Sequence, residues 1–181
     1  MTKPKIMNQR KEFLELNEIG ASYRGKILNE CIWLERIIDT YIAHKFCYDE
    51  KQVTEMQLLF LGNERIGYNA KVQIFQVLAK KHNPDILGEK DEFIKQLTEI
   101  MKERNFLAHS LLDTTEEARY KEDGEIGFLR FMDKAYSKQY TTQTIIEKCR
   151  HIKQIADKIY QLLSLPAFPS PSATGPSSED Q

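Results

Sequence analysis

Apolar residues recur three and four positions apart over most of this chain, which is the spacing of amphipathic helices. A short, irregular helix is predicted over residues 3–17, and it stops before Gly20. Ser22 can then cap a long helix that runs to about Phe46. The single Trp33 is expected to be buried or to lie in an interface. The apolar stripe of the long helix consists of Leu28, Cys31, Ile32, Ile38, Ile42 and Phe46.

Capping and helix-breaking residues delimit two helices in the middle of the chain. Asp49 can cap a helix through about Leu61, and Asn63 can begin another over residues 64–81. Asn83-Pro84 ends the second one, because proline cannot continue helical hydrogen bonding. This second helix carries apolar groups on more than one side. It is therefore either buried all round or has one side in an oligomer interface.

Two more helices are predicted in the second half of the chain. The first runs from Asp91 to about Leu111. The last is capped by Thr141 or Thr142 and runs to about Leu165, and Pro166 ends it. These assignments make the chain all-α, a bundle of four to five helices.

The helical period fades between these two helices. A small β-hairpin insertion is predicted over about 118–132, with its turn at Asp123-Gly124. Its aromatic residues are expected to pack against the bundle rather than to stack on bases; they are Tyr120, Phe128 and Phe131. Residues 1–165 are thus expected to form one domain, and residues 166–181 a disordered Pro/Ser-rich tail.

One helix carries a charge where its apolar face requires an apolar residue. The face consists of Phe93, Leu97, Ile100, Arg104, Ala108 and Leu111. Successive members are three or four residues apart, which is the helical spacing. A guanidinium cannot be deprotonated, so its burial is costly unless it is paired or lies in a cleft that admits an anion. Arg104 therefore indicates a site.

Two further polar residues stand close to Arg104 on this helix. Asn105 and His109 are four residues apart and share a face, with Arg104 at the edge of the same arc. Together they offer a permanent cation, an amide and an imidazole that titrates near neutral pH, which suits the handling of a phosphate. The alternative is structural: Arg104 snorkels or pairs with a buried carboxylate, and His109 caps the helix C-terminus.

The run Arg104-Asn-Phe-Leu-Ala-His109, late in a helix and preceded by the long amphipathic segment Lys26–Phe46, resembles the motif of the HEPN superfamily of small helical domains. That motif is an arginine, usually a polar residue next, and a histidine after four to six intervening positions; here four residues intervene. The resemblance covers roughly Ser22–Leu163. It implies a HEPN-like helical bundle.

In many HEPN proteins this motif is the active site of a metal-independent endoribonuclease, often a toxin or an antiviral effector. The resemblance implies RNA as substrate and a homodimer whose two motifs face each other in a composite active site. An antitoxin or another regulatory protein is a further implied partner. Other members have lost catalysis and serve as scaffolds or nucleotide-binding modules, so a catalytically silent module that binds a partner protein or a nucleotide is the alternative.

The expected chemistry follows from the residue types. RNA carries its own nucleophile, the 2′-hydroxyl, so no metal or cofactor is required. His109 would act as general base or acid, Arg104 would hold the non-bridging phosphate oxygens, and Asn105 would orient His109 or the phosphate. The products would be a 2′,3′-cyclic phosphate and a 5′-hydroxyl.

Glu35 and Asp39 are charges inside the apolar register of the long helix, four residues apart on one face. In one interpretation, one of them orients His109 or pairs with Arg104, since HEPN domains often carry a polar or acidic residue on this helix. In the other, they bind Arg36 or another basic side chain at the edge of the helix.

Composition limits the class of protein. The chain is 41% apolar and 29% charged with a net charge of -1, which disfavours a broad nucleic-acid surface but allows a local cleft. No secretory signal or apolar stretch of membrane-spanning length is visible, so a cytoplasmic protein is expected. The spacing of Cys31, Cys47 and Cys149 fits neither a disulfide framework nor a metal site. Cys31 and Cys149 are expected to be core or interface thiols.

Overall fold

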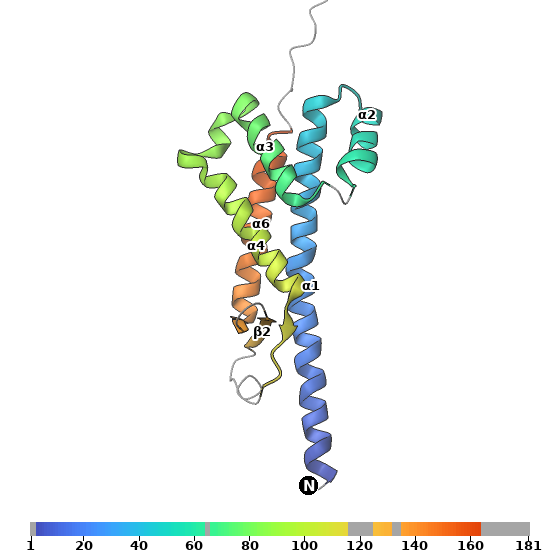
Figure 1. Ribbon diagram of the computed structural model, residues 1–181, viewed down its shortest axis with the longest axis vertical. Coiled ribbons are helices and arrows are strands. Elements are labelled where there is room, and N and C mark those ends of the chain that lie inside the picture. Colours follow the sequence, from blue (N-terminus) through green and yellow to red (C-terminus); the bar gives the residue numbers. More distant parts are fainter. Residues whose placement is uncertain (1–2, 64–65, 116–124, 132–134, 164–181) are drawn as a thin grey trace, which may run out of the picture.

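The computed structural model describes residues 3–63, 66–115, 125–131 and 135–163. One helix, α1 (Lys3–Phe46), forms the long axis of the molecule (Figure 1). The later helices α3 (Tyr68–His82), α4 (Glu92–His109) and α6 (Thr142–Gln161) pack along it, and its N-terminal end extends beyond them (Figure 1). The predicted break at residues 17–22 is wrong, because α1 is continuous and Ser22 lies inside it.

Gly20 explains why the sequence pattern failed at this point. A glycine inside a helix costs about 1 kcal/mol relative to alanine, which makes it look like a helix end. Here Gly20 is buried, and a Cβ on it would lie 2.8 Å from Cδ1 of Leu112. The missing side chain therefore allows the start of the β-sheet to approach the helix closely.

The first capping prediction is confirmed. Helix α2 (Glu50–Glu55) begins after Asp49, whose Oδ1 accepts a hydrogen bond of 2.9 Å from the backbone N–H of Gln52. The same segment continues as a π-helix, η1 (Met56–Leu61), so the helical stretch ends where the sequence indicated.

Helix α3 (Tyr68–His82) starts later than predicted, with Gly67 rather than Asn63 at its N-cap. Its end at Asn83-Pro84 is confirmed. Two short 3-10 turns follow, η2 (Pro84–Leu87) and η3 (Glu89–Asp91).

The last two helices agree closely with the pattern. Helix α4 (Glu92–His109) follows Asp91. Helix α6 (Thr142–Gln161) begins at a capping box formed by Thr141 and Thr144. The predicted end near Leu165 and the tail at 166–181 lie outside the described residues.

A small antiparallel sheet connects α4 to α6. Its strands are β1 (Leu111–Leu112), β2 (Ile126–Phe131) and β3 (Ala135–Tyr140), in the order β1-β2-β3. The second strand of the predicted hairpin is confirmed as β2, and its first strand lies outside the described residues. Its expected turn at Asp123-Gly124 lies outside the described residues, and the long pairing of β2 is with β3, which the sequence did not reveal.

The core lies between α1 and the other helices. The ring centroids of Tyr41 on α1 and Phe75 on α3 are 4.9 Å apart. The ring centroid of Phe93 on α4 lies 6.0 Å from that of Phe75. Cys31 is buried there as expected, and burial raises the pKa of its thiol to about 12. In the described ranges no helix is long and apolar enough to cross a membrane.

The buried stripe of α1 differs in part from the predicted one. Ile32 and Phe46 are exposed, and Trp33 is also exposed, at 53% of its surface. The core side of α1 instead runs through Ile27, Cys31, Leu34, Ile38, Tyr41 and Ile42. The molecule is thus a helical bundle with a small sheet at one end of the packed region (Figure 1).

Candidate functional site

The motif residues lie in the last two turns of α4, beside the sheet. Arg104 and His109 are exposed, and Asn105 is half-buried. Nη1 of Arg104 donates a hydrogen bond of 3.0 Å to Oδ1 of Asn105. Within the part of the chain that the structure describes, His109 makes no hydrogen bond or ion pair. The imidazole is therefore open to solvent rather than engaged in its own bundle.

Arg104 does not stand in the buried face of α4, contrary to the prediction. The buried face continues from Ile100 to Leu107, whereas Arg104 and Ala108 are exposed, as is Leu111 just beyond the helix. The sheet explains this difference. Glu103 and Phe106, on the other side of α4, contact β3, so that side of the helix faces the sheet.

Arg104 nevertheless borders a small cavity. A cavity of about 10 Å³, enough for a single water molecule, is lined by Cys31, Glu35, Tyr68, Ile100, Met101 and Arg104. Oη of Tyr68 is buried there without a hydrogen-bond partner among the described residues. The structure thus brings Glu35 and Arg104 to one cavity, although it records no ion pair between them in the described ranges.

Among the described residues, Glu35 and Asp39 pair with Lys71 rather than with Arg104 or His109. Nζ of Lys71 on α3 lies 2.7 Å from Oε1 of Glu35 and 2.8 Å from Oδ2 of Asp39, and Lys71 is only 4% exposed. Burial raises the pKa of Asp39 even though the hydrogen bond and charge of Lys71 oppose the shift. Both carboxylates therefore join α1 to α3 through a basic side chain, which is Lys71 and not Arg36. Neither contacts His109 in the described part of the structure.

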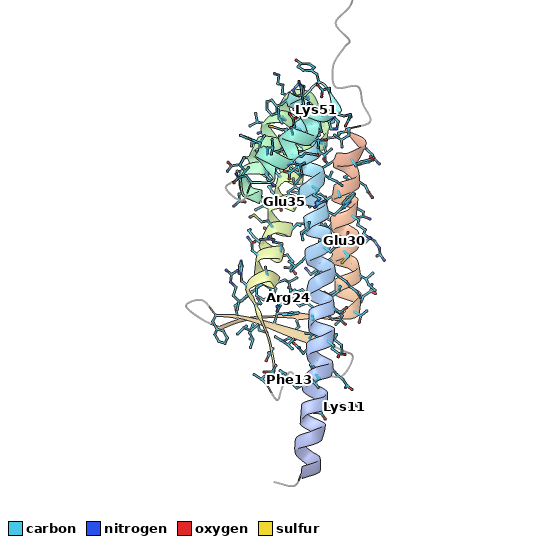
Figure 2. The ribbon with its side chains drawn as sticks, turned by 90° about the vertical axis from the view of Figure 1, so that its right-hand side faces the viewer. Lys11, Phe13, Arg24, Glu30, Glu35 and Lys51 are labelled. Atoms are coloured by element: carbon cyan, nitrogen blue, oxygen red, sulfur yellow. The ribbon has the colours of Figure 1, made fainter. Side chains whose placement is uncertain are left out.

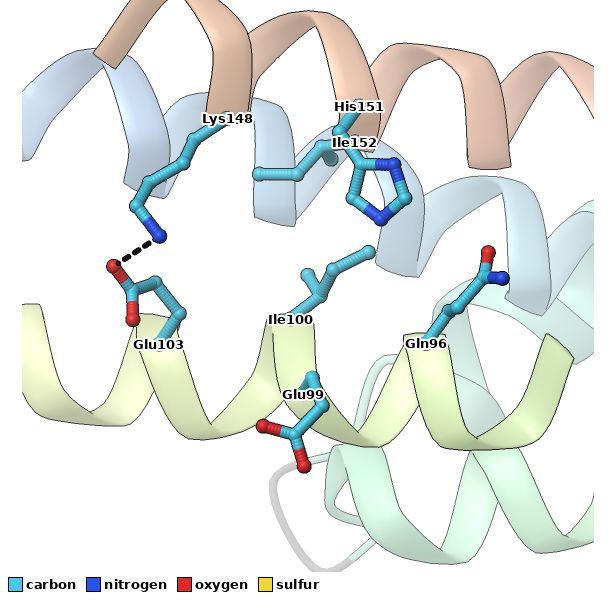
Figure 3. A pocket seen from close by; sticks show the side chains of 7 residues that line it. All are labelled: Gln96, Glu99, Ile100, Glu103, Lys148, His151 and Ile152. Carbon is cyan, nitrogen blue, oxygen red and sulfur yellow. Dashed lines mark ion pairs between the residues drawn. The ribbon is translucent and has the colours of Figure 1, made fainter. Parts of the chain in front are cut away.

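Glu103 is a second important residue that the sequence analysis missed. Its carboxylate accepts hydrogen bonds from Nζ of Lys138 at 2.7 Å and from Oη of Tyr140 at 2.8 Å, both on β3. Nζ of Lys148 on α6 lies 3.0 Å from Oε1 (Figure 3). Glu103 thus fixes the motif end of α4 to the sheet and to α6. All three contacts are long-range, so no local pattern signals them.

The charge of Glu103 should make stability depend on pH. Burial alone would raise the pKa of Glu103, but the bonds from Lys138, Lys148 and Tyr140 lower it below its ordinary value of 4.5. This carboxylate therefore stabilises the fold above that value, and the contribution is lost as the pH falls through the lowered pKa. Glu103→Gln should cost about 1.5–3 kcal/mol of unfolding free energy near pH 7.

Urea unfolding at neutral and at acidic pH tests this prediction. The deficit of Glu103→Gln relative to the wild type should shrink in acid, where the wild-type carboxyl is itself protonated. An equal deficit at both pH values would contradict it.

A larger groove lies between α4 and α6. It has a volume of about 170 Å³ and is lined by Gln96, Glu99, Ile100, Glu103, Lys148, His151 and Ile152 (Figure 3). Its base is apolar, formed by Ile100 and Ile152. None of Arg104, Asn105 and His109 lines it, so it is separate from the motif.

Within the described ranges, no group of three or more His, Cys, Asp or Glu side chains is placed to hold a metal ion. The motif itself offers a guanidinium, an amide and an imidazole. Comparison with known proteins adds nothing further, because no family model, curated protein or solved structure matches this chain significantly.

Proposed function

We propose that this protein is a metal-independent endoribonuclease of the HEPN type, and that Arg104, Asn105 and His109 carry the reaction. One observation supports this proposal most strongly. A permanent cation and an imidazole lie exposed on the same end of one helix, with an amide between them that already binds the arginine. In the proposed reaction, these three groups act on one phosphate.

The residues have distinct roles in the proposed reaction. His109 takes the proton from the 2′-hydroxyl, whose oxygen forms a new bond to phosphorus while the bond to the 5′-oxygen breaks. The guanidinium of Arg104 binds the non-bridging oxygens, where negative charge grows in the transition state. Asn105 holds Arg104 in place through its 3.0 Å hydrogen bond. The products are a 2′,3′-cyclic phosphate and a 5′-hydroxyl.

One histidine cannot act as base and acid in the same step. The second proton, which goes to the leaving 5′-oxygen, would come from His109 of another copy in a homodimer with a composite site. The exposure of His109 supports this arrangement, because a histidine packed into its own bundle could not reach a site shared with a partner. Such an enzyme would act on RNA in the cytoplasm as a toxin or antiviral defence effector, restrained by an antitoxin or regulatory protein.

A substrate comparison tests this proposal. Purified protein is first incubated with an RNA mixture in excess EDTA, and an RNA that it cuts is identified. The same RNA is then tested with hydrogen in place of the 2′-hydroxyl at the cut position. The proposal predicts that the unmodified RNA is cut and that the modified RNA stays intact. Cutting that requires a divalent metal, or that does not need the 2′-hydroxyl, would contradict it.

The second candidate is a catalytically silent helical module that binds a partner protein. It is favoured by apolar side chains exposed on α1 and η1, since contiguous exposed apolar groups are typical of interaction surfaces. These are Ile32 and Trp33, with Leu58 and Leu59, each at least half exposed. RNA left intact by folded protein would favour this function.

A further inference from the structure

The two long strands of the sheet present a polar end next to the motif. In the β2–β3 register, Phe128 pairs with Lys138 and Arg130 pairs with Tyr136, so all four side chains are on one face. The inner part of this face, with Phe128 and Tyr140, is buried. The outer part is formed by Arg130, Tyr136 and Lys138, which we call the outer sheet face. Figure 2 shows the strands projecting past α4 at this end.

The outer sheet face is joined directly to the motif helix. The ring of Tyr136 meets the ring of Phe106 edge to face, with centroids 5.5 Å apart and planes at 87°. Nζ of Lys138 lies 4.8 Å from the centre of the Phe106 ring. Phe106 is three residues before His109 and therefore neighbours it on the helix. A polymer bound at His109 can continue onto Tyr136.

Positive charge is concentrated in this region although the whole chain is slightly acidic. Glu103 faces both Lys138 and Lys148, so the cluster of these three side chains keeps one net positive charge. Arg130 has no ion pair with a described residue and adds a second. The ring of Tyr136 is 53% exposed although it contacts Phe106. Cations beside an open aromatic ring fit a nucleic-acid strand.

We propose that the outer sheet face binds the substrate of the motif as single-stranded RNA. An unpaired base stacks on the ring of Tyr136, and Arg130 and Lys138 neutralise the phosphates on either side of it. Duplex RNA is excluded because its bases are already stacked on one another and offer no free ring face. This inference rests on the proposed ribonuclease function, since it assigns the substrate class of that site.

Binding can be measured without cleavage. The probe is a short, fluorescently labelled 2′-O-methyl RNA, which lacks the attacking hydroxyl, and the readout is anisotropy as a function of salt. Tyr136→Leu should weaken single-strand binding about five- to tenfold, whereas Tyr136→Phe should bind as the wild type does. Arg130→Gln should reduce the slope of log K against log salt by about 0.7 for each phosphate that the protein then leaves without a cation.

Matched controls are available at the far end of the bundle. Tyr160→Leu removes a similarly exposed tyrosine, at 57%, and Lys51→Gln removes an exposed cation on α2 (Figure 2). Neither should change binding. Thermal unfolding of each variant checks that the fold is kept, and Arg130→Gln serves if Tyr136→Leu does not fold.

The outcomes separate this inference from the ribonuclease proposal. Weaker binding by Tyr136→Leu and Arg130→Gln, with duplex RNA bound less tightly than the single strand, supports the inference even if the wild type cuts no RNA. Variants that bind as the wild type does, or a duplex bound equally well, overturn it even if RNA is cut and the cutting requires His109. A wild type that binds no single strand overturns it as well.

Discussion

His109→Ala is expected to reduce RNA cleavage by about 10²- to 10⁴-fold, the contribution of a positioned general acid or base. The thermal midpoint should stay close to that of the wild type, because His109 is exposed and bonds to no described residue. Cleavage of a labelled RNA in EDTA, compared at equal protein concentration, measures the loss. Arg104→Ala should reduce cleavage too, and Arg104→Lys should restore it only in part, since lysine cannot form the bidentate contact.

His151→Ala is the matched control for this prediction. His151 is also exposed, but it stands on α6 at the groove between α4 and α6. Its replacement should leave cleavage unchanged. If His109→Ala and His151→Ala both cut like the wild type, the imidazole of His109 has no part in the reaction.

Lys71→Met is expected to lower the free energy of unfolding by about 3–5 kcal/mol, the usual cost of leaving a buried charge without its partner. The ammonium of Lys71 binds both Glu35 and Asp39, and Asp39 is only 8% exposed. Chemical denaturation at neutral pH measures the loss. The deficit should shrink as the pH falls, because burial already raises the pKa of Asp39 and an unpaired Asp39 would take up a proton more readily still.

Two comparisons make the stability prediction specific. Lys80→Met removes another lysine of α3, whose side chain is 55% exposed and pairs with Asp91 at 3.1 Å. Its cost should stay below about 1 kcal/mol. Adding Asp39→Leu to Lys71→Met should recover much of the lost stability, since the pair is then replaced by apolar groups. A Lys71→Met variant as stable as Lys80→Met would contradict the prediction.

Helix ends with a local chemical cause could be predicted from the sequence. Asp49 and Thr141 cap the helices that follow them, and Asn83-Pro84 ends α3. Gly20 and Ser22 misled the prediction, because the close contact of Gly20 with Leu112 on β1 is invisible in the local sequence. Strand β3 was missed for a similar reason. Its sequence has no clear apolar alternation, and its position depends on pairing with β2.

The candidate site shows the same division between local and distant causes. The grouping of Arg104 with Asn105 follows from their places on one helix and is present in the structure. The prediction that Arg104 interrupts a buried face was wrong, because Glu103 and Phe106 contact the sheet and turn the other side of α4 inward. One missed residue had a detectable signal. Lys71 stands four residues before the buried Phe75, so it is a charge in the core face of α3, as Asp39 is in that of α1.

The end groups of the RNA fragments test the central claim most directly. Wild-type protein and Arg104→Ala are incubated with RNA in excess EDTA, and any fragments are analysed for cyclic phosphate at the 3′ side of the cut and hydroxyl at the 5′ side. We predict both end groups from the wild type and strongly reduced cutting by Arg104→Ala. Intact RNA with the folded wild type, or fragments with 5′-phosphate ends, would contradict the claim.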